Sequence, residues 1–203
     1  MIIASIDLFA AFVAVGLIVV LLPDSHYDIH GARLRGTATT LAVVLTDSGR
    51  WPALTAIAVV LAVLFGVMRW PLWIPAVVAL SQVTSQAVIE GVKRLFRRLR
   101  PGDWLGRAEH GYSYPSGHSS TAVTFFCAWA LVAWYSPLPH VARVALAAFL
   151  VLWAIGIAWS RLALAAHFLT DVIGGWLFGS AWLCLMLTIA MHAKGPAFLP
   201  GLR

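Results

Sequence analysis

Six long apolar segments dominate this chain and restrict what it can fold into. They span roughly residues 4–22, 52–68, 72–92, 119–135, 141–159 and 171–192. A helix of about 20 apolar residues crosses the hydrocarbon core of a bilayer, and each segment is close to that length. We therefore predict an all-α, polytopic membrane protein, in which about six transmembrane helices form a bundle and residues 1–203 form a single membrane-embedded domain.

The composition agrees with a membrane location. Hydrophobic residues make up 61% of the chain and charged residues 11%, whereas soluble proteins carry about 25% charged residues. Little chain remains outside the apolar segments, so a separate soluble domain is not expected. The first segment contains Asp7 and no basic residue precedes it, so we interpret it as a retained helix rather than a signal peptide.

Residues 23–50 connect the first two segments and mix polar residues with one short apolar stretch, residues 37–45. That stretch is too short to cross a bilayer. An interfacial or partly buried helix is the better interpretation of it.

The net charge of +6 raises the question of a nucleic-acid partner. The cations, however, cluster in the polar loop of residues 93–116, which contains Lys93, Arg94, Arg97, Arg98, Arg100 and Arg107. A local cluster fits an anionic substrate or lipid headgroups better than nucleic acid, so no nucleic-acid partner is expected. Both cysteines, Cys127 and Cys184, lie inside apolar segments, which argues against a disulfide framework and against a paired-cysteine zinc site.

The number of crossings places the polar motifs on one face of the membrane. Two apolar segments joined by a short turn lie between His118 and Ser160. An even number of crossings returns the chain to the side it left. The polar loop, His118 and residues 160–171 therefore share one face, and polar residues gathered there predict a functional site.

The loop and the helix that follows it have the chemistry of an anion site. Lys93 and Arg100 supply positive charge, and arginine offers a fork of donors that matches phosphate oxygens. Ser116 and Gly117 directly precede the fourth apolar segment. Free N–H groups at a helix start favour an anion, and glycine permits close approach of the backbone.

A histidine and an aspartate follow the fifth apolar segment, four residues apart. If this part of the chain is helical, His167 and Asp171 lie on one face. The carboxylate could then hold one imidazole nitrogen and leave the other as a nucleophile.

Each feature taken alone has a simpler interpretation. Arginines beside a membrane helix commonly bind headgroups or orient the protein, and Pro-Ser-Gly before a helix is ordinary turn and cap chemistry. A His–Asp pair at this spacing is often a structural hydrogen bond or part of a metal site. A metal is disfavoured here because Lys93 and the arginines would repel a cation. The combination, rather than any single feature, indicates an active site.

Written out, the motifs are Lys93-x6-Arg100-Pro101, Pro115-Ser116-Gly117-His118 and Ser160-Arg161-x5-His167-x3-Asp171. This pattern resembles the three-part signature of the type 2 phosphatidic acid phosphatase family, which also includes vanadium haloperoxidases and some acid phosphatases. Every signature position is filled, in the right order. The motifs cover residues 93–171, and the six-helix layout extends the resemblance to most of the chain.

The resemblance implies a mechanism with no metal and no other cofactor. His167 would attack phosphorus to form a phosphohistidine, Asp171 would orient His167, and His118 would protonate the leaving oxygen and then activate water. The phosphoryl oxygens would be held by Lys93, Arg100, Ser116, Gly117 and Arg161. Because attack needs a neutral histidine and leaving-group protonation needs a charged one, we expect a bell-shaped pH dependence.

The substrate and the orientation are less constrained. The expected partner is a lipid phosphate within the bilayer, with undecaprenyl diphosphate as the leading substrate. Phosphatidylglycerol phosphate, phosphatidic acid and lipid A phosphates are alternatives. Transfer to another acceptor, haloperoxidase activity and a lipid-binding protein without activity are further interpretations. The cations on the motif face favour the cytoplasm by charge count. The resemblance instead implies a bacterial inner-membrane protein with its site facing the periplasm or exterior and both termini inside.

Overall fold

The computed structural model describes residues 1–22, 37–101 and 109–194, and within these ranges the chain forms helices and connecting loops but no β-strand. The expected all-α fold is confirmed. In chain order, the elements are α1 (Ile2–Leu21), α2 (Thr37–Ser48), α3 (Trp51–Val67), α4 (Trp73–Phe96), α5 (Gly117–Thr121), the π-helix η2 (Ala122–Cys127), α6 (Ala128–Tyr135), α7 (His140–Ala163) and α8 (Leu169–Lys194).

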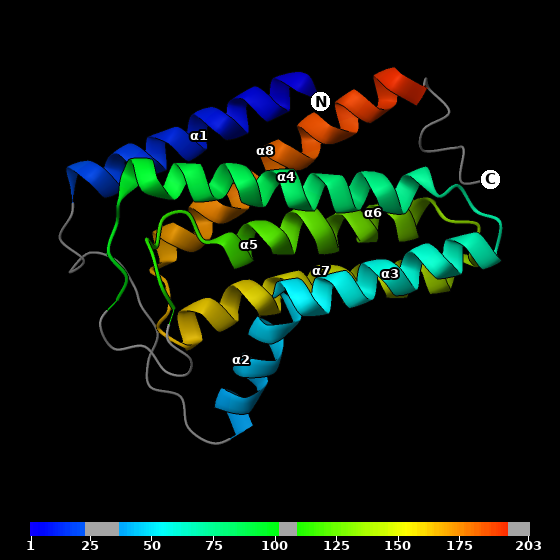
Figure 1. Ribbon diagram of the computed structural model, residues 1–203, viewed down its shortest axis with the longest axis horizontal. Coiled ribbons are helices and arrows are strands. Elements are labelled where there is room, and N and C mark those ends of the chain that lie inside the picture. The colour runs from blue at the N-terminus through cyan, green and yellow to red at the C-terminus, as the bar shows by residue number, and fades with distance from the viewer. Residues whose placement is uncertain (23–36, 102–108, 195–203) are drawn as a thin grey trace.

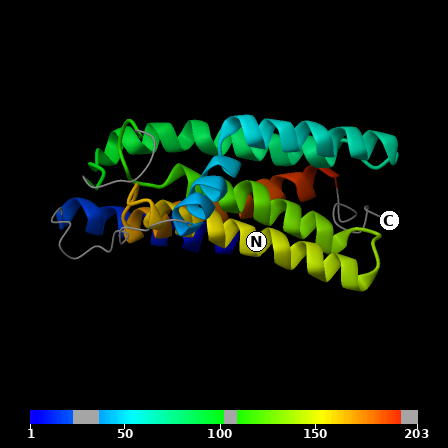
Figure 2. The same ribbon diagram turned by 90° about the horizontal axis from the view of Figure 1, so that it is seen from below.

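Most of these helices lie side by side as a bundle. Figure 1 shows α3, α4, α7 and the continuous α5–η2–α6 rod running along one axis, with α1 and α8 packed obliquely against them. Helix α2 leaves the bundle at one end, where it packs against α7. The view from below shows α3 and α4 as a pair along one edge of the bundle (Figure 2).

The helix lengths agree with a multi-pass membrane protein. Helices α1, α7 and α8 are each long and apolar enough to cross a membrane, and α2 and α3, bent by 60° at their junction, together pass as a fourth crossing. The outer surface is strongly apolar, since Val63 on α3 is 59% exposed and Leu152 on α7 is 66% exposed. The count of six crossings stays a prediction.

Two element boundaries matter for the site. The stretch expected as an interfacial helix forms α2, and residues 23–36 before it lie outside the described ranges. Helix α4 continues to Phe96, so Lys93 lies on its last turn and not in a loop as expected. A helix holds the ammonium group more rigidly than a loop would.

The end of α8 near the site packs closely on α5. A Cβ atom on Gly175 would lie 2.4 Å from the Ser116 carbonyl oxygen and 2.8 Å from the Ser119 Cβ. A Cβ on Gly179, one turn later, would lie 2.9 Å from the Ser120 carbonyl oxygen. The GxxxG pair therefore allows the two backbones to meet, as such pairs do in membranes, and it sets the position of α5.

An aromatic cluster fastens α1 and α8 to the segment before α5. Tyr114 stacks on Phe12 with ring centroids 5.6 Å apart, and its hydroxyl donates to the Phe12 carbonyl oxygen at 2.9 Å. Phe178 of α8 meets Phe12 edge-on at 5.5 Å. This cluster fixes the position of Pro115 and the residues after it.

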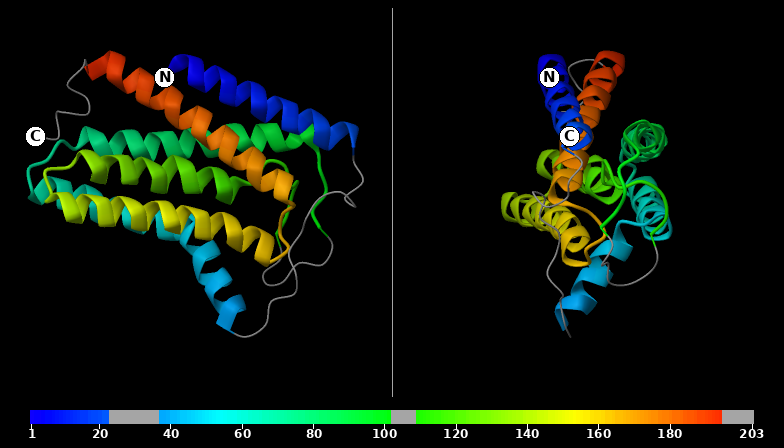
Figure 3. Two further views of the ribbon diagram at one scale, coloured as in Figure 1. Left: turned by 180° about the vertical axis from the view of Figure 1, so that it is seen from behind. Right: turned by 90° about the vertical axis from the view of Figure 1, so that its left-hand side faces the viewer.

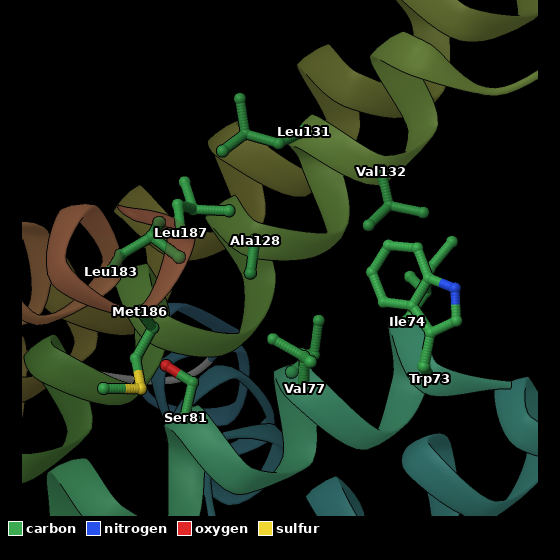
Figure 4. Close-up of a pocket in the computed structure, with 11 residues that line it drawn as sticks. Trp73, Ile74, Val77, Ser81, Ala128, Leu131, Val132, Leu183, Met186 and Leu187 are labelled. Carbon is green, nitrogen blue, oxygen red and sulfur yellow. The ribbon is translucent and has the colours of Figure 1, made fainter. Parts of the chain in front are cut away.

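A small apolar cavity of about 40 Å³ lies deeper in the bundle, between α4, α6 and α8 (Figure 4). Its walls include Trp73, Val77, Leu131 and Met186, and Ser81 is the polar side chain among them. It shares no lining residue with the cavity described next.

Candidate active site

The three sequence motifs meet at one end of the bundle. The last turns of α4 and α7 and the first turns of α5 and α8 gather there (Figure 1). They surround a cavity of about 410 Å³ whose lining includes Lys93, Arg100, Gly117, His118 and His167. The expectation that these residues share one face of the membrane protein is met by their geometry.

His167 lies on the loop between α7 and α8. Helix α8 begins at Leu169, so His167 precedes the helix and does not share a helical face with Asp171. The two side chains nevertheless meet, with Nδ1 of His167 3.2 Å from Oδ2 of Asp171. The same oxygen accepts the Phe168 backbone N–H at 3.0 Å. This second bond is the capping contact that the third residue of a helix makes with the N-cap, and it turns the carboxylate toward the loop.

The hydrogen bonds of His167 define its tautomer. Nη1 of Arg100 lies 3.0 Å from Nε2 of His167. Because a guanidinium can only donate, Nε2 must accept, so the ring proton is on Nδ1 and points at Asp171. Burial, followed by the positive charges of Arg100, Arg161 and Lys93, holds the pKa of His167 well below its ordinary value. The residue therefore presents a neutral ring with its lone pair toward the cavity.

The segment before α5 is held by its own cap. Oγ of Ser116 accepts from the Ser119 N–H at 3.4 Å and from the Ser119 hydroxyl at 2.9 Å, while the Ser116 N–H donates to the Asp171 carbonyl oxygen at 2.9 Å. Ser116 is fully buried and does not line the cavity. Of these two predicted phosphate ligands, Ser116 supports the start of α5, whereas Gly117 lines the cavity.

Gly117 and His118 form the wall beside Lys93. A Cβ atom on Gly117 would lie 3.1 Å from Oε1 of Gln86, which is a tight approach, and 3.8 Å from Nζ of Lys93, which is ordinary contact, so a larger residue would crowd Gln86. Nε2 of His118 is buried and makes no hydrogen bond with the described residues. Nζ of Lys93 pairs with Glu90, three residues earlier on α4, at 2.8 Å.

Arg161 does not line the cavity and is buried next to it. It is 1% exposed, and its Nη1 donates to Oγ1 of Thr46 at 3.1 Å. Its Nη2 pairs at 2.9 Å with Oε1 of Glu109, which also pairs with Nη2 of Arg50 at 3.0 Å. Burial alone would raise the pKa of the Glu109 carboxyl, but Arg161, Arg100 and Arg50 outweigh burial and lower it. The ionised Glu109 thus covers the predicted phosphate ligand Arg161.

Comparison with known proteins settles the family. The profile of the PAP2 superfamily matches residues 70–194, which include all three motifs. The chain belongs to the PAP2 superfamily. The resemblance inferred from the motifs, to the type 2 phosphatidic acid phosphatases, is confirmed.

Individual PAP2 relatives and a solved PAP2 structure are also similar. The chain is 32% identical over 136 residues to a lipid A 1-phosphatase of Rhizobium johnstonii, covering 62% of this chain and 51% of the relative. It is 33% identical over 92 residues to phosphatidylglycerophosphatase B of Escherichia coli K12, covering 45% of this chain and 34% of the relative. The chain thus matches about half, or less, of the length of these curated relatives.

The fold likeness extends over nearly the whole chain. A crystal structure of a transmembrane PAP2-type phosphatidylglycerolphosphate phosphatase from Bacillus subtilis superposes with a TM-score of 0.75, at 20% sequence identity, over 95% of this chain and 98% of that one. This confirms the polytopic helical fold.

Two further groups in the PAP2 site were not singled out from sequence. Arg98, counted only as a member of the basic loop, donates to Oδ1 of Asp171 at 2.7 Å. Gln86 of α4 donates to the Gly117 carbonyl oxygen at 3.2 Å and to Oγ1 of Thr121 at 3.1 Å. No local sequence pattern predicts either contact, because each joins residues far apart in the chain.

No group of three or more histidine, cysteine, aspartate or glutamate side chains that could hold a metal occurs in the described ranges. The metal-free mechanism stays a prediction. Arg107 of the basic loop lies outside the described residues.

Proposed function

We propose that this PAP2 protein is a lipid phosphatase that hydrolyses a phosphate monoester or diphosphate through a phosphohistidine. One observation carries the proposal: Lys93, Arg100, Gly117, His118 and His167 line a single cavity. Cations, free backbone N–H groups and a neutral imidazole in one cavity are what phosphoryl transfer requires, since its catalysis is mostly positioning and electrostatic stabilisation.

In the first step, Nε2 of His167 attacks phosphorus as the P–O bond to the lipid breaks. Arg100 must leave Nε2 at that point, and a phosphoryl oxygen is the nearest new acceptor for its N–H groups. His118 gives its proton to the departing oxygen. In the second step, His118 takes a proton from water, the hydroxide attacks phosphorus, and the N–P bond breaks to release phosphate and restore His167.

The phosphoryl group is held by charge and by amides. Lys93 and Arg100 reach it from α4 and the loop after it, and the first turn of α5 offers N–H groups at Gly117 and His118. Arg161 reaches the same oxygens only where the substrate takes the place of the Glu109 carboxylate, which now covers Nη2.

A groove in the membrane region supports a lipid substrate. It has a volume of about 460 Å³ and runs between α3 and α4, with Ala58, Ala62 and Val83 among its walls. Trp51, Leu54 and Gln82 line both this groove and the active-site cavity. A lipid tail in the groove would therefore place its headgroup at His167, which fits sideways entry from the bilayer.

The names of the relatives bear on the headgroup. Lipid A 1-phosphate and phosphatidylglycerol phosphate are named among them, whereas undecaprenyl diphosphate, the leading substrate from sequence, is not. We therefore put the first two ahead of undecaprenyl diphosphate and phosphatidic acid.

Phosphate release by the purified protein from these four lipids tests the proposal, with p-nitrophenyl phosphate as a water-soluble comparison. We expect release from at least one lipid, turnover of the lipid above that of the soluble ester, and loss of both with His167→Ala. Release that survives His167→Ala would refute the mechanism. Release only in the presence of an added acceptor would instead identify a phosphotransferase, and lipid binding without release a non-enzymatic protein.

We also propose the inner membrane of a bacterium as the location, with the cavity facing the periplasm. The relatives from Gram-negative bacteria and the family resemblance support this orientation, while the charge count opposes it. The cations of the cavity are explained by phosphate binding, so they carry little information on topology.

A further inference from the structure

We infer that Arg98, which occupies a position that the first motif leaves unspecified, is a positioning residue that acts on the proposed nucleophile His167 through Asp171. The inference rests on the proposed function, in which His167 attacks phosphorus. Arg98 itself does not line the active-site cavity.

The end of α4 directs Arg98 toward α8. Arg97 ends the helix in the left-handed conformation, with φ of 49°, so the chain leaves the helix after the last turn. The Arg98 carbonyl oxygen then accepts the Ser113 N–H at 2.8 Å. With its backbone held against the segment that leads into α5, the Arg98 side chain extends to the first turn of α8.

The guanidinium is held on three sides at that turn. Its Nη1 donates to Oδ1 of Asp171 at 2.7 Å and to Oγ1 of Thr170 at 2.6 Å. Its carbon lies 4.2 Å from the centre of the Phe168 ring, a cation–π contact. The side chain is 12% exposed and that of Asp171 is 0% exposed, so the pair is screened little by solvent.

The carboxylate of Asp171 divides its two oxygens between two tasks. Oδ1 accepts from Arg98 and, at 3.4 Å, from the Ser113 hydroxyl. Oδ2 accepts from Nδ1 of His167 and from the Phe168 N–H. Because Arg98 holds Oδ1, the carboxylate cannot rotate away from the imidazole. Arg98 also pairs with the buried negative charge of Asp171, which would destabilise the fold if it had no partner.

This arrangement connects Arg98 to the chemistry in one step. A fixed Oδ2 keeps the ring proton on Nδ1, and that proton position leaves the lone pair of Nε2 aimed at phosphorus. Loss of Arg98 should lower the fraction of His167 in the reactive tautomer and orientation. The effect should fall on kcat, since groups that contact the substrate remain in place.

A double-mutant cycle tests the coupling. Arg98→Met should lower kcat on the order of 10²-fold and change KM by less than about threefold. Arg98→Lys, which keeps a donor for Oδ1, should recover about tenfold of the loss. In an Asp171→Asn background, Arg98→Met should have little further effect, because coupled residues are not additive. Equal losses in both backgrounds would overturn the inference. The matched control is Arg94→Met, which removes an exposed arginine from the last turn of α4. This variant should keep full activity.

A readout without turnover separates this inference from the proposed function. Arg100 also favours this tautomer because it donates to Nε2 of His167, so the measurement is made in an Arg100→Gln background. In that protein, labelled with ¹⁵N-histidine, the His167 shifts should show a single tautomer with the proton on Nδ1. Adding Arg98→Met should give a mixture of tautomers, and adding Arg98→Lys should keep the single form. An unchanged single tautomer in the folded double variant with Arg98→Met would overturn the inference. Absence of phosphate release from all lipids would refute the proposed function alone, since the tautomer measurement does not depend on it.

Discussion

At the scale of single residues, the site depends on one neutral histidine among cations. His167 combines burial with three nearby positive charges, and Arg100 donates directly to Nε2, the nitrogen proposed to attack phosphorus. A histidine in such surroundings stays unprotonated at pH values where an ordinary histidine is charged. In the proposed mechanism, His167 is therefore in its attacking form across the neutral pH range, with Asp171 in contact with the other ring nitrogen.

This environment predicts the acidic side of the pH profile. The pKa of His167 is lowered, so its neutral form persists as pH falls past 6.5 and is lost only at lower pH. We expect the acidic limb of kcat/KM to lie clearly below pH 6.5, and to move toward higher pH in Arg100→Gln, which removes one of the depressing charges. Initial rates from pH 4 to 9, measured for the wild type and for Arg100→Gln, give the position of the acidic limb and its shift. An acidic limb at or above pH 6.5 in the wild type would contradict the role of the cations.

At the scale of elements, the contact between α5 and α8 positions the segment that we propose binds phosphate. Gly175 brings the α8 backbone against the carbonyl oxygen of Ser116. In the other direction, the Asp171 carbonyl oxygen accepts the Ser116 N–H. On the far side of α5, Gln82 and Gln86 of α4 both donate to Oγ1 of Thr121. Helix α5 is thus held from two sides, and its first turn has little freedom.

A glycine substitution tests this contact. Gly175→Ala would place a methyl group 2.4 Å from a carbonyl oxygen, so α5 and α8 must separate, at a cost of about 1–3 kcal/mol for overpacking. We expect a lower Tm and at least about a tenfold loss of phosphate release.

The matched control is Gly91→Ala on α4, where an added Cβ meets no atom within 4 Å. Alanine favours a helix over glycine by about 0.8–1.0 kcal/mol, so this variant should keep its activity and be at least as stable as the wild type. Equal activity in the two variants would show that the α5–α8 contact does not position the site.

At the scale of the whole molecule, the chain start and the end of α8 lie away from the active site. Figure 3 shows α1 beginning and α8 ending toward the end of the bundle opposite the cavity. Helix α8 has 26 residues and is therefore about 39 Å long, close to the thickness of a bilayer with its headgroups. The two ends of the bundle are thus on opposite sides of the membrane.

Because of this arrangement, one measurement is enough to determine the membrane topology. With the cavity facing the periplasm, a reporter fused at Arg203 should be cytoplasmic. Green fluorescent protein at that position should fluoresce, and alkaline phosphatase at the same position should be inactive. The opposite pair of results would place the active site in the cytoplasm, as the charge count favours.

The sequence by itself determined the class of fold and most of the motif residues that gather at the cavity. The lengths of the apolar segments predict a membrane protein, because residue type and spacing are local properties that a sequence displays directly. For the same reason, the three motifs identify Lys93, Arg100, His118 and His167, which line the cavity. Even the contact between His167 and Asp171 was expected, although a helix cap rather than a helical turn brings them together.

Only the tertiary structure decided which partner each group meets. Arg98 and Asp171 are separated by 73 positions, and Arg50 and Glu109 by 59. The first pair depends on how the end of α4 meets the start of α8, and the second on how the junction of α2 and α3 meets the loop before α5. No periodicity within one segment shows where such distant parts of the chain come together. The same reason explains why Ser116 and Arg161, both motif residues, lie behind the cavity wall, since burial is a property of the packed bundle and not of the residue type.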